Sequence, residues 1–98
     1  MYQIFYHRLV EKEDFKKIPV RDREKIVKAI DKKLSSNPVA YGKALTGSLK
    51  GFFRLRVDFY RVIYQVDGGK VAVFVVKIGF RKDLKAYIQA AQRLGLKG

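Results

Sequence analysis

The chain of 98 residues has no cysteine, one histidine and two prolines. The absence of cysteine excludes disulfides, zinc–thiolate sites and thiol nucleophiles. The single histidine, His7, excludes a metal site built from several histidines and an acid–base pair of histidines. No apolar run approaches the roughly 18 residues that a membrane span needs, and the N-terminal residues lack the basic-then-apolar order of a signal peptide. These absences predict a cytoplasmic protein with no metal, no small-molecule cofactor and no membrane contact.

Acidic residues are few and unevenly distributed. The sequence has 22 Lys and Arg against nine Asp and Glu, which gives a net charge of +13. Residues 1–31 hold eight basic and six acidic residues, whereas residues 32–98 hold fourteen basic and three acidic ones. A protein this basic accumulates polyanions at its surface through counterion release. We therefore expect a nucleic acid, an acidic protein, or both as partners; a basic surface that only aids solubility is the alternative.

The order of elements predicts one small α+β domain over residues 1–98. In this prediction a small antiparallel sheet is packed by two N-terminal helices and one C-terminal helix. We expect strands at 2–6, 52–57, 60–66 and 70–80, helices at 8–18, 20–35 and 83–94, and a loop at 36–50.

Local patterns support the central elements of this prediction. The helix at 20–35 has an apolar stripe at helical spacing, made of Ile26, Val27, Ile30 and Leu34. In 52–57 apolar residues alternate with Arg54 and Arg56, so the two arginines share one face of a strand. We expect the two N-terminal helices to cover the other face and this one to be at least partly open. Asp67-Gly68-Gly69 predicts a hairpin turn, because glycine supplies positive φ.

The C-terminal helix has a thin apolar side. Asp83 is a possible N-cap. We expect the residues that face the sheet to be Leu84, Ile88, Ala91 and Leu94.

Arginine is the residue type that can carry chemistry here. The carboxylates lie mainly before residue 32, and neither a Ser-His-Asp arrangement nor a P-loop is present. Basic residues fall in or next to the strands of one sheet: Arg54, Arg56, Arg61, Lys77 and Arg81. Arginines that converge on one surface bind a phosphodiester and stabilise the charge of its transition state. The periodicity equally allows each arginine to pair with a helix carboxylate or to extend over the sheet edge.

A longer motif resembles the RelE/ParE toxin superfamily. The family hallmark R-x-x-x-Y-R-x-x-Y is matched by Arg56, Tyr60, Arg61 and Tyr64. A valine-rich strand follows over 70–80 and ends in Gly79-Phe80-Arg81, and Tyr87 comes after it. Upstream, Lys43-Ala44-Leu45-Thr46-Gly47 is similar to the family's K-L-x-G segment with one residue added. The resemblance covers nearly the whole chain and implies a RelE-like fold of order βααβββα.

The resemblance also implies an activity. RelE-type members are ribosome-dependent endoribonucleases that cut messenger RNA by metal-independent attack of a 2′-hydroxyl, whereas ParE-type members inhibit DNA gyrase. The RelE-type catalytic positions are matched by Arg54, Arg61, Arg81 and Tyr87. The resemblance implies that Arg61 stabilises the reacting phosphate, Arg81 assists the leaving group and Tyr87 stacks on or orients a nucleotide. Further RNA contacts are expected at Lys43, Lys50, Arg56, Lys77, Lys82 and Lys85.

The implied partners are an acidic antitoxin protein, the ribosome and messenger RNA. One departure from the family pattern is Phe52, which stands where a well-known member has a lysine. A second lysine position is Arg54, which preserves the charge but is a poor proton acceptor at neutral pH. A gyrase inhibitor and a catalytically weak family member are the alternatives that the sequence leaves open.

Overall fold

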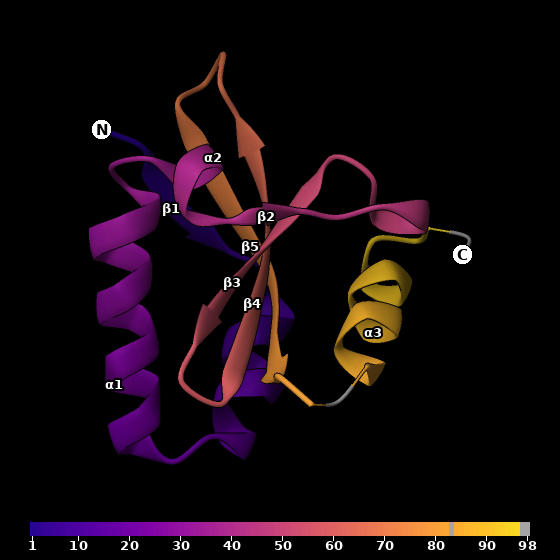
Figure 1. The fold of residues 1–98 in the computed structure, drawn as a ribbon. Coiled ribbons are helices and arrows are strands. Elements are labelled where there is room, and N and C mark those ends of the chain that lie inside the picture. The colour runs from indigo at the N-terminus through magenta and orange to yellow at the C-terminus, as the bar shows by residue number, and fades with distance from the viewer. Residues whose placement is uncertain (83, 97–98) are drawn as a thin grey trace.

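The computed structural model describes residues 1–82 and 84–96, and it consists of one five-stranded sheet with helices on both faces (Figure 1). The strand order is β1-β5-β4-β3-β2, with β1 parallel to β5 and the other neighbours antiparallel. The strands are β1 (Gln3–Tyr6), β2 (Lys43–Ala44), β3 (Phe52–Val57), β4 (Tyr60–Asp67) and β5 (Ala72–Phe80). The α-helices are α1 (Val20–Ala29), α2 (Pro38–Tyr41) and α3 (Lys85–Arg93). Within the described ranges no helix is long and apolar enough to cross a membrane.

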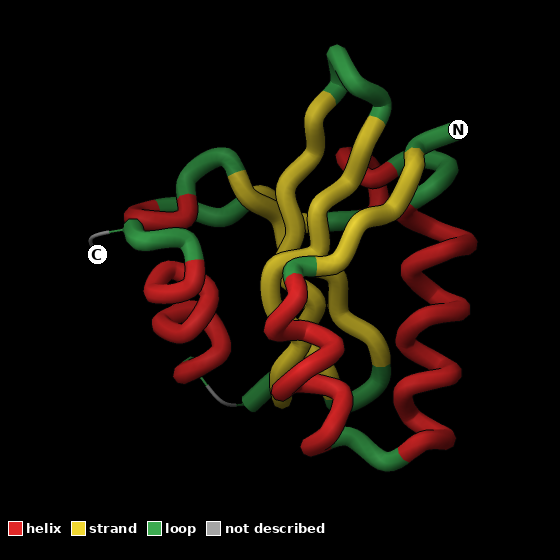
Figure 2. The backbone as a smooth tube through the Cα atoms, turned by 180° about the vertical axis from the view of Figure 1, so that it is seen from behind, coloured by secondary structure: helices red, strands yellow, loops and turns green. Residues whose placement is uncertain are grey.

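The helices α1 and α3 lie on opposite sides of the sheet (Figures 1 and 2). The expected α+β class, the strands β3 to β5 and the C-terminal helix are confirmed. The expected helix at 8–18 forms as two irregular turns, η1 (Val10–Asp14) and η2 (Phe15–Lys17). The helix at 20–35 is α1 followed by a wider turn, η3 (Ile30–Leu34). The face that carries the arginines is covered over part of its area by α3.

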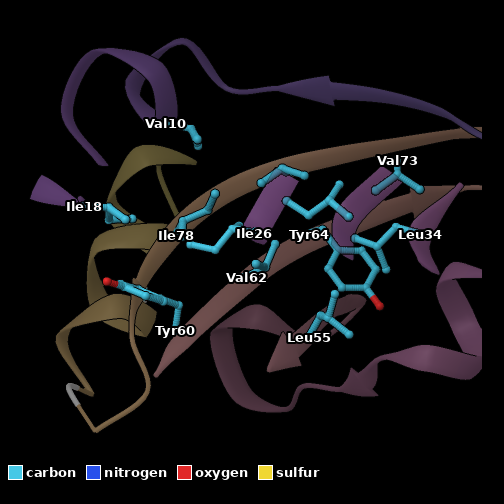
Figure 3. Packing of buried hydrophobic residues seen from close by; sticks show 12 residues of the cluster. Val10, Ile18, Ile26, Leu34, Leu55, Tyr60, Val62, Tyr64, Val73 and Ile78 are labelled. Carbon is cyan, nitrogen blue, oxygen red and sulfur yellow. The ribbon is translucent and has the colours of Figure 1, made fainter. Parts of the chain in front are cut away.

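The main core lies between α1 and the sheet (Figure 3). The predicted stripe is largely confirmed, because Ile26, Ile30 and Leu34 are fully buried there. The sheet contributes the residues of β3, β4 and β5 that point toward α1, among them Leu55, Val62, Tyr64, Val73 and Ile78. A second, smaller cluster lies between the other face of the sheet and α3. Alternation along each strand therefore divides the sheet between two cores.

The segment 36–50, expected as a loop, contains regular structure. It holds α2, the edge strand β2 and a short turn of 3₁₀ helix, η4 (Gly47–Leu49). Tyr64 from the centre of the sheet donates a 2.6 Å hydrogen bond from its hydroxyl to the carbonyl oxygen of Pro38. Burial raises the pKa of Tyr64 above its ordinary value. Gly42 passes close to this ring: a Cβ there would lie 1.8 Å from the Tyr64 hydroxyl oxygen. This segment is thus packed on the core through Pro38 and Gly42.

The hairpin between β4 and β5 forms, but its glycines do not have the positive φ that predicted the turn. The residue with positive φ is Val71, at 53°. The Asp67 side chain accepts a 3.1 Å hydrogen bond from the Lys70 amide and closes the turn. A β-branched residue in this region is strained. The N-cap expected at Asp83 lies outside the described residues.

Candidate functional site

A hollow of about 530 Å³ lies where the β3–β4 turn meets the end of β5. We call it the basic hollow. It is lined by Arg56, Phe59, Tyr60, Arg61, Phe80, Arg81 and Lys82. Two of the four expected catalytic residues, Arg61 and Arg81, therefore meet here, together with two of the expected RNA contacts, Arg56 and Lys82.

Two arginines of the basic hollow face each other across neighbouring strands. Arg56 of β3 and Arg61 of β4 are direct cross-strand partners. Like charges at directly opposed positions destabilise a sheet. Arg81 is held at the same end, because its Nη1 donates a 2.9 Å hydrogen bond to the carbonyl oxygen of Asp58. The Asp58 carboxylate lies 3.9 Å from Lys25 Nζ of α1. The arrangement concentrates positive charge that a bound anion would relieve.

Arg61 is the most unusual residue of this cluster. Its side chain is almost completely buried, with the residue only 6% exposed. The Nε and Nη1 atoms are buried without a hydrogen-bond partner among residues 1–82 and 84–96. The ring of Tyr87 from α3 lies over the guanidinium, with its centroid 4.4 Å from Cζ. A buried charge with unmade hydrogen bonds costs free energy, and the contact with the Tyr87 ring offsets part of this cost.

Several other predicted site residues do not line the basic hollow, among them Arg54, Lys43, Lys50 and Lys85. Arg54 is half-buried on β3, on the same face as Arg56, and its cross-strand partner on β2 is Lys43. Lys50 is exposed in the turn before β3, and Lys85 is exposed at the start of α3. The structure thus places Arg54 beside the basic hollow, although it does not line it.

Lys77 is not available as an RNA contact, which corrects the sequence-based expectation. The alternation of side chains between the two faces of the sheet shifts at a bulge in the pairing of β4 with β5. Ile63 of β4 pairs with Lys77 of β5, but the next residue, Tyr64, pairs with Val75. The Lys77 side chain is buried, and its Nζ donates a 2.9 Å hydrogen bond to Asp14 Oδ1. Because this lysine is committed to an internal ion pair, its charge cannot meet a surface phosphate.

Asp14 is the centre of a buried polar network that the sequence did not indicate. Its side chain is fully buried. Arg93 of α3 donates two hydrogen bonds to it, from Nη1 to Oδ2 at 2.7 Å and from Nη2 to Oδ1 at 2.6 Å. The Ile78 amide donates a further one at 2.9 Å. Burial raises the pKa of Asp14, but the hydrogen bonds from Arg93, the Ile78 amide and Lys77 outweigh this and hold it below its ordinary value.

The face of α3 that meets the sheet differs in part from the predicted one. Leu84 and Ile88 are 69% and 58% exposed, which contradicts the prediction. Ala91 is buried and Leu94 packs against the same cluster, as predicted, and the other buried positions are Ala86 and Ala90. Small side chains let the helix approach the strand closely. The helix therefore presents Leu84 and Ile88 to solvent, whereas Tyr87 and Leu94 pack against the cluster beneath it.

Two further features of the site were missed or underrated by sequence reasoning. Phe59 is 76% exposed and Phe80 is half exposed, and both line the basic hollow. Surfaces that stack nucleobases typically combine aromatic rings with basic side chains.

Phe52, at the position of a family lysine, is buried with Leu49 and Ile63 beneath α3. It is therefore a core residue in this chain.

Comparisons with known proteins identify the family. The family model described as the ParE toxin of the type II toxin–antitoxin system parDE matches residues 4–85. A curated relative, toxin RelG of Mycobacterium tuberculosis, is 31% identical over 71 residues, which are 72% of this chain and 82% of that protein. The messenger-RNA interferase toxin RelE of Escherichia coli is 42% identical over 41 residues, 42% of this chain and 43% of that protein.

Solved structures agree with the sequence matches. The chain is similar to the crystal structure of the toxin–antitoxin complex RelBE2 from Mycobacterium tuberculosis, with a TM-score of 0.76 and 28% identity. The match covers 82% of this chain and 98% of that one. The family match over most of the chain, the identity to RelG and the shared fold lead to one conclusion: the chain belongs to the RelE/ParE superfamily of toxins of type II toxin–antitoxin systems.

Proposed function

We propose that this toxin is a ribosome-dependent endoribonuclease that cleaves messenger RNA and so inhibits translation. The observation that carries the proposal is the basic hollow, where Arg61, whose Nε and Nη1 have no hydrogen-bond partner among the described residues, lies with Arg56 and Arg81. Such a cluster fits the extra negative charge of a phosphodiester in its transition state. The names of the curated RelE relatives support the same activity.

The proposed reaction is an internal transesterification. The 2′-hydroxyl of a nucleotide loses its proton to solvent as its oxygen attacks the adjacent phosphorus, the bond from phosphorus to the 5′-oxygen breaks, and the leaving oxygen takes up a proton. The products are a 2′,3′-cyclic phosphate and a 5′-hydroxyl. Arg61 stabilises the pentacovalent phosphate, Arg81 donates a hydrogen bond to the leaving oxygen and Arg54 holds the phosphate in place. Tyr87 stacks on or orients a nucleotide, and Phe59 offers a second stacking surface.

Proton transfer distinguishes this chain from the family pattern. Phe52 is part of the apolar cluster under α3 and cannot accept a proton. An arginine at position 54 remains protonated at neutral pH. Catalysis then depends mainly on charge stabilisation and positioning, and a low turnover is expected compared with relatives that have lysines at these positions.

We also propose the partners of the toxin. Lys82, which lines the hollow, and the exposed residues Lys43, Lys50 and Lys85 would contact ribosomal and messenger RNA. The relative of known structure from Mycobacterium tuberculosis forms a toxin–antitoxin complex. By analogy, an acidic antitoxin is the expected protein partner of this chain, because its net charge is +13.

The test is cleavage of a translated message. The toxin is expressed in growing cells, and primer extension maps new 5′ ends on a defined message. Arg61→Ala should lower single-turnover cleavage on purified ribosomes by about 10²–10³-fold. Ribosome binding should change far less, because one side chain contributes little to a large basic footprint. Lys28→Ala is the matched control, since it removes the same charge from an exposed position on α1. Equal losses in binding and cleavage would refute the assignment of Arg61.

Inhibition of DNA gyrase is the second candidate, favoured by the family model that carries the ParE name. It predicts intact messages, a DNA-damage response, and toxicity that survives replacement of Arg81 and Tyr87. New message ends that disappear in those two variants would exclude it.

A further inference from the structure

A groove of about 730 Å³ lies between α3 and the segment that precedes β3. We call it the helix groove. The turn η4 lies beside the C-terminal end of α3 in both views of the fold (Figures 1 and 2). The apolar part of the lining includes Leu45, Leu49, Ile88 and Leu96. The volume of the groove is in the range of sites that hold small organic groups.

Both walls of the helix groove are fixed by the fold. On one wall, Leu49 is 4% exposed and anchors η4 in the cluster beneath α3. The other wall is the end of α3, where Gly95 has a positive φ of 69°. The Leu96 amide donates to the Ala91 carbonyl oxygen at 2.9 Å, and the Gly95 amide donates to the Gln92 carbonyl oxygen at 3.1 Å. Helices that end on a left-handed glycine show this pair of bonds, and here it brings Leu96 into the lining of the groove.

The helix groove adjoins the basic hollow through two residues in contact. Arg61 lines the basic hollow, and its Cζ lies 4.4 Å from the centroid of the Tyr87 ring. Tyr87 in turn lines the helix groove. A phosphate bound in the basic hollow and a group bound in the helix groove therefore lie on neighbouring parts of one continuous surface.

The two depressions differ in their chemistry. None of the described residues that line the helix groove is charged, whereas the basic hollow has three arginines and a lysine. The groove instead has three polar, uncharged residues, Thr46, Ser48 and Gln92, all of them exposed. Thr46 makes no capping hydrogen bond in η4. A nucleobase, which has apolar faces and a polar edge, fits such a lining, and single-stranded RNA is bound by charge along its backbone and by contacts with its bases.

We propose that the helix groove is a nucleobase subsite, and that Gln92 binds the polar edge of the base next to the phosphate in the basic hollow. This proposal rests on the proposed function. A glutamine amide donates to and accepts from adenine at once, whereas guanine is read by arginine or lysine and cytosine by a carboxylate. Because no side chain of these last kinds is among the described residues of the lining, adenine is the expected base.

Nuclear magnetic resonance of the whole chain tests the subsite without any cleavage. Adenosine 5′-monophosphate should shift the side-chain amide signals of Gln92 and the methyl signals of Ile88, and should bind about tenfold more tightly than cytidine 5′-monophosphate. Ribose 5-phosphate has the phosphate but no base, so it should shift signals of the basic hollow and leave those of the helix groove unchanged. The Gln92→Ala variant should bind the two nucleotides about equally. Gln89→Ala is the matched control, because Gln89 belongs to the same helix but lines a different hollow, beside Asp14.

Two results of the binding experiment would overturn the proposal. One is the absence of any shift in the helix groove with either nucleotide, which would leave its apolar surface to a protein partner. The other is a Gln92→Ala variant that still prefers adenosine monophosphate.

Cleavage of message on ribosomes separates the proposal from the proposed function. The parent protein should cut most often next to adenine, and Gln92→Ala should raise KM at those positions by about tenfold with little change in kcat, as expected for a contact made equally in the ground state and the transition state. If the parent cuts no message while adenosine monophosphate still shifts the groove signals, the proposed function fails and the subsite stands. If the parent cuts messages and Gln92→Ala keeps the same base preference, the subsite is refuted and the proposed function stands.

Discussion

The replacement Arg61→Met should make the protein more stable. Two buried donors of Arg61 have no partner, and each such group costs about 1–3 kcal/mol. The stack on Tyr87 offsets about 0.5–2 kcal/mol of this cost, and the charge of Arg56 on the neighbouring strand adds repulsion. Methionine fills a similar space without a charge or a donor. We therefore expect the free energy of unfolding to rise by about 1–3 kcal/mol.

Urea denaturation followed by circular dichroism measures this change, and the melting temperature should rise by about 4–8 °C for each kcal/mol in a chain of this size. Arg93→Met is the matched control, because it applies the same substitution to a second buried arginine that has a carboxylate partner. That variant should lose about 3–5 kcal/mol. If Arg61→Met instead lost more than about 1 kcal/mol, Arg61 would be a structural residue and the reasoning for the site would be refuted.

Three other changes test the fold by urea denaturation. Gly42→Ala should lower the free energy of unfolding by about 2–4 kcal/mol, because its Cβ would lie 1.8 Å from the Tyr64 hydroxyl oxygen and break a buried hydrogen bond; an unchanged midpoint would contradict this packing. Val71→Gly should raise stability by about 1 kcal/mol by relieving its positive φ, whereas a loss would show that the turn is not strained. The pKa of Asp14 is lowered in the folded protein, so its ionised carboxylate stabilises the fold at any pH above the ordinary pKa of a carboxyl group. This stabilisation is lost as the pH falls through the pKa that Asp14 has in the folded protein. The urea midpoint of the parent protein should therefore fall below about pH 4, and the midpoint of the Asp14→Asn variant should fall less over the same pH range.

Much of the fold could be predicted because its signals are local. The stripe Ile26, Ile30 and Leu34 follows helical spacing and is buried as expected. The alternation in β3 correctly placed Arg54 and Arg56 on one face of the sheet. Such patterns involve neighbours in sequence, and they need no knowledge of distant partners. The short elements α2 and β2 were missed because four residues and two residues, respectively, carry too little periodicity.

The remaining details depend on contacts between distant residues. Arg93 and Asp14 are 79 positions apart, and nothing in either neighbourhood indicates the pairing. The orientation of α3 is set by such contacts, because a hydropathy pattern weighs Leu84 and Ile88 above alanines. Close approach to Gly79 favours the alanine face instead. Lys77 was misplaced for a related reason: a bulge changes the alternation of a strand, and one sequence does not reveal where a bulge occurs.

The parallel pairing of β1 with β5 has a consequence for the time at which the sheet can form during synthesis. Gln3 is synthesised long before its partner across the ladder, Ala72. Tyr87, which lies over Arg61, and Arg93, which pairs with Asp14, are added later still. Protein domains fold as units during synthesis, so a nascent chain carries an unpaired first strand and no assembled site. The candidate site can therefore assemble only after the residues up to Arg93 have been synthesised.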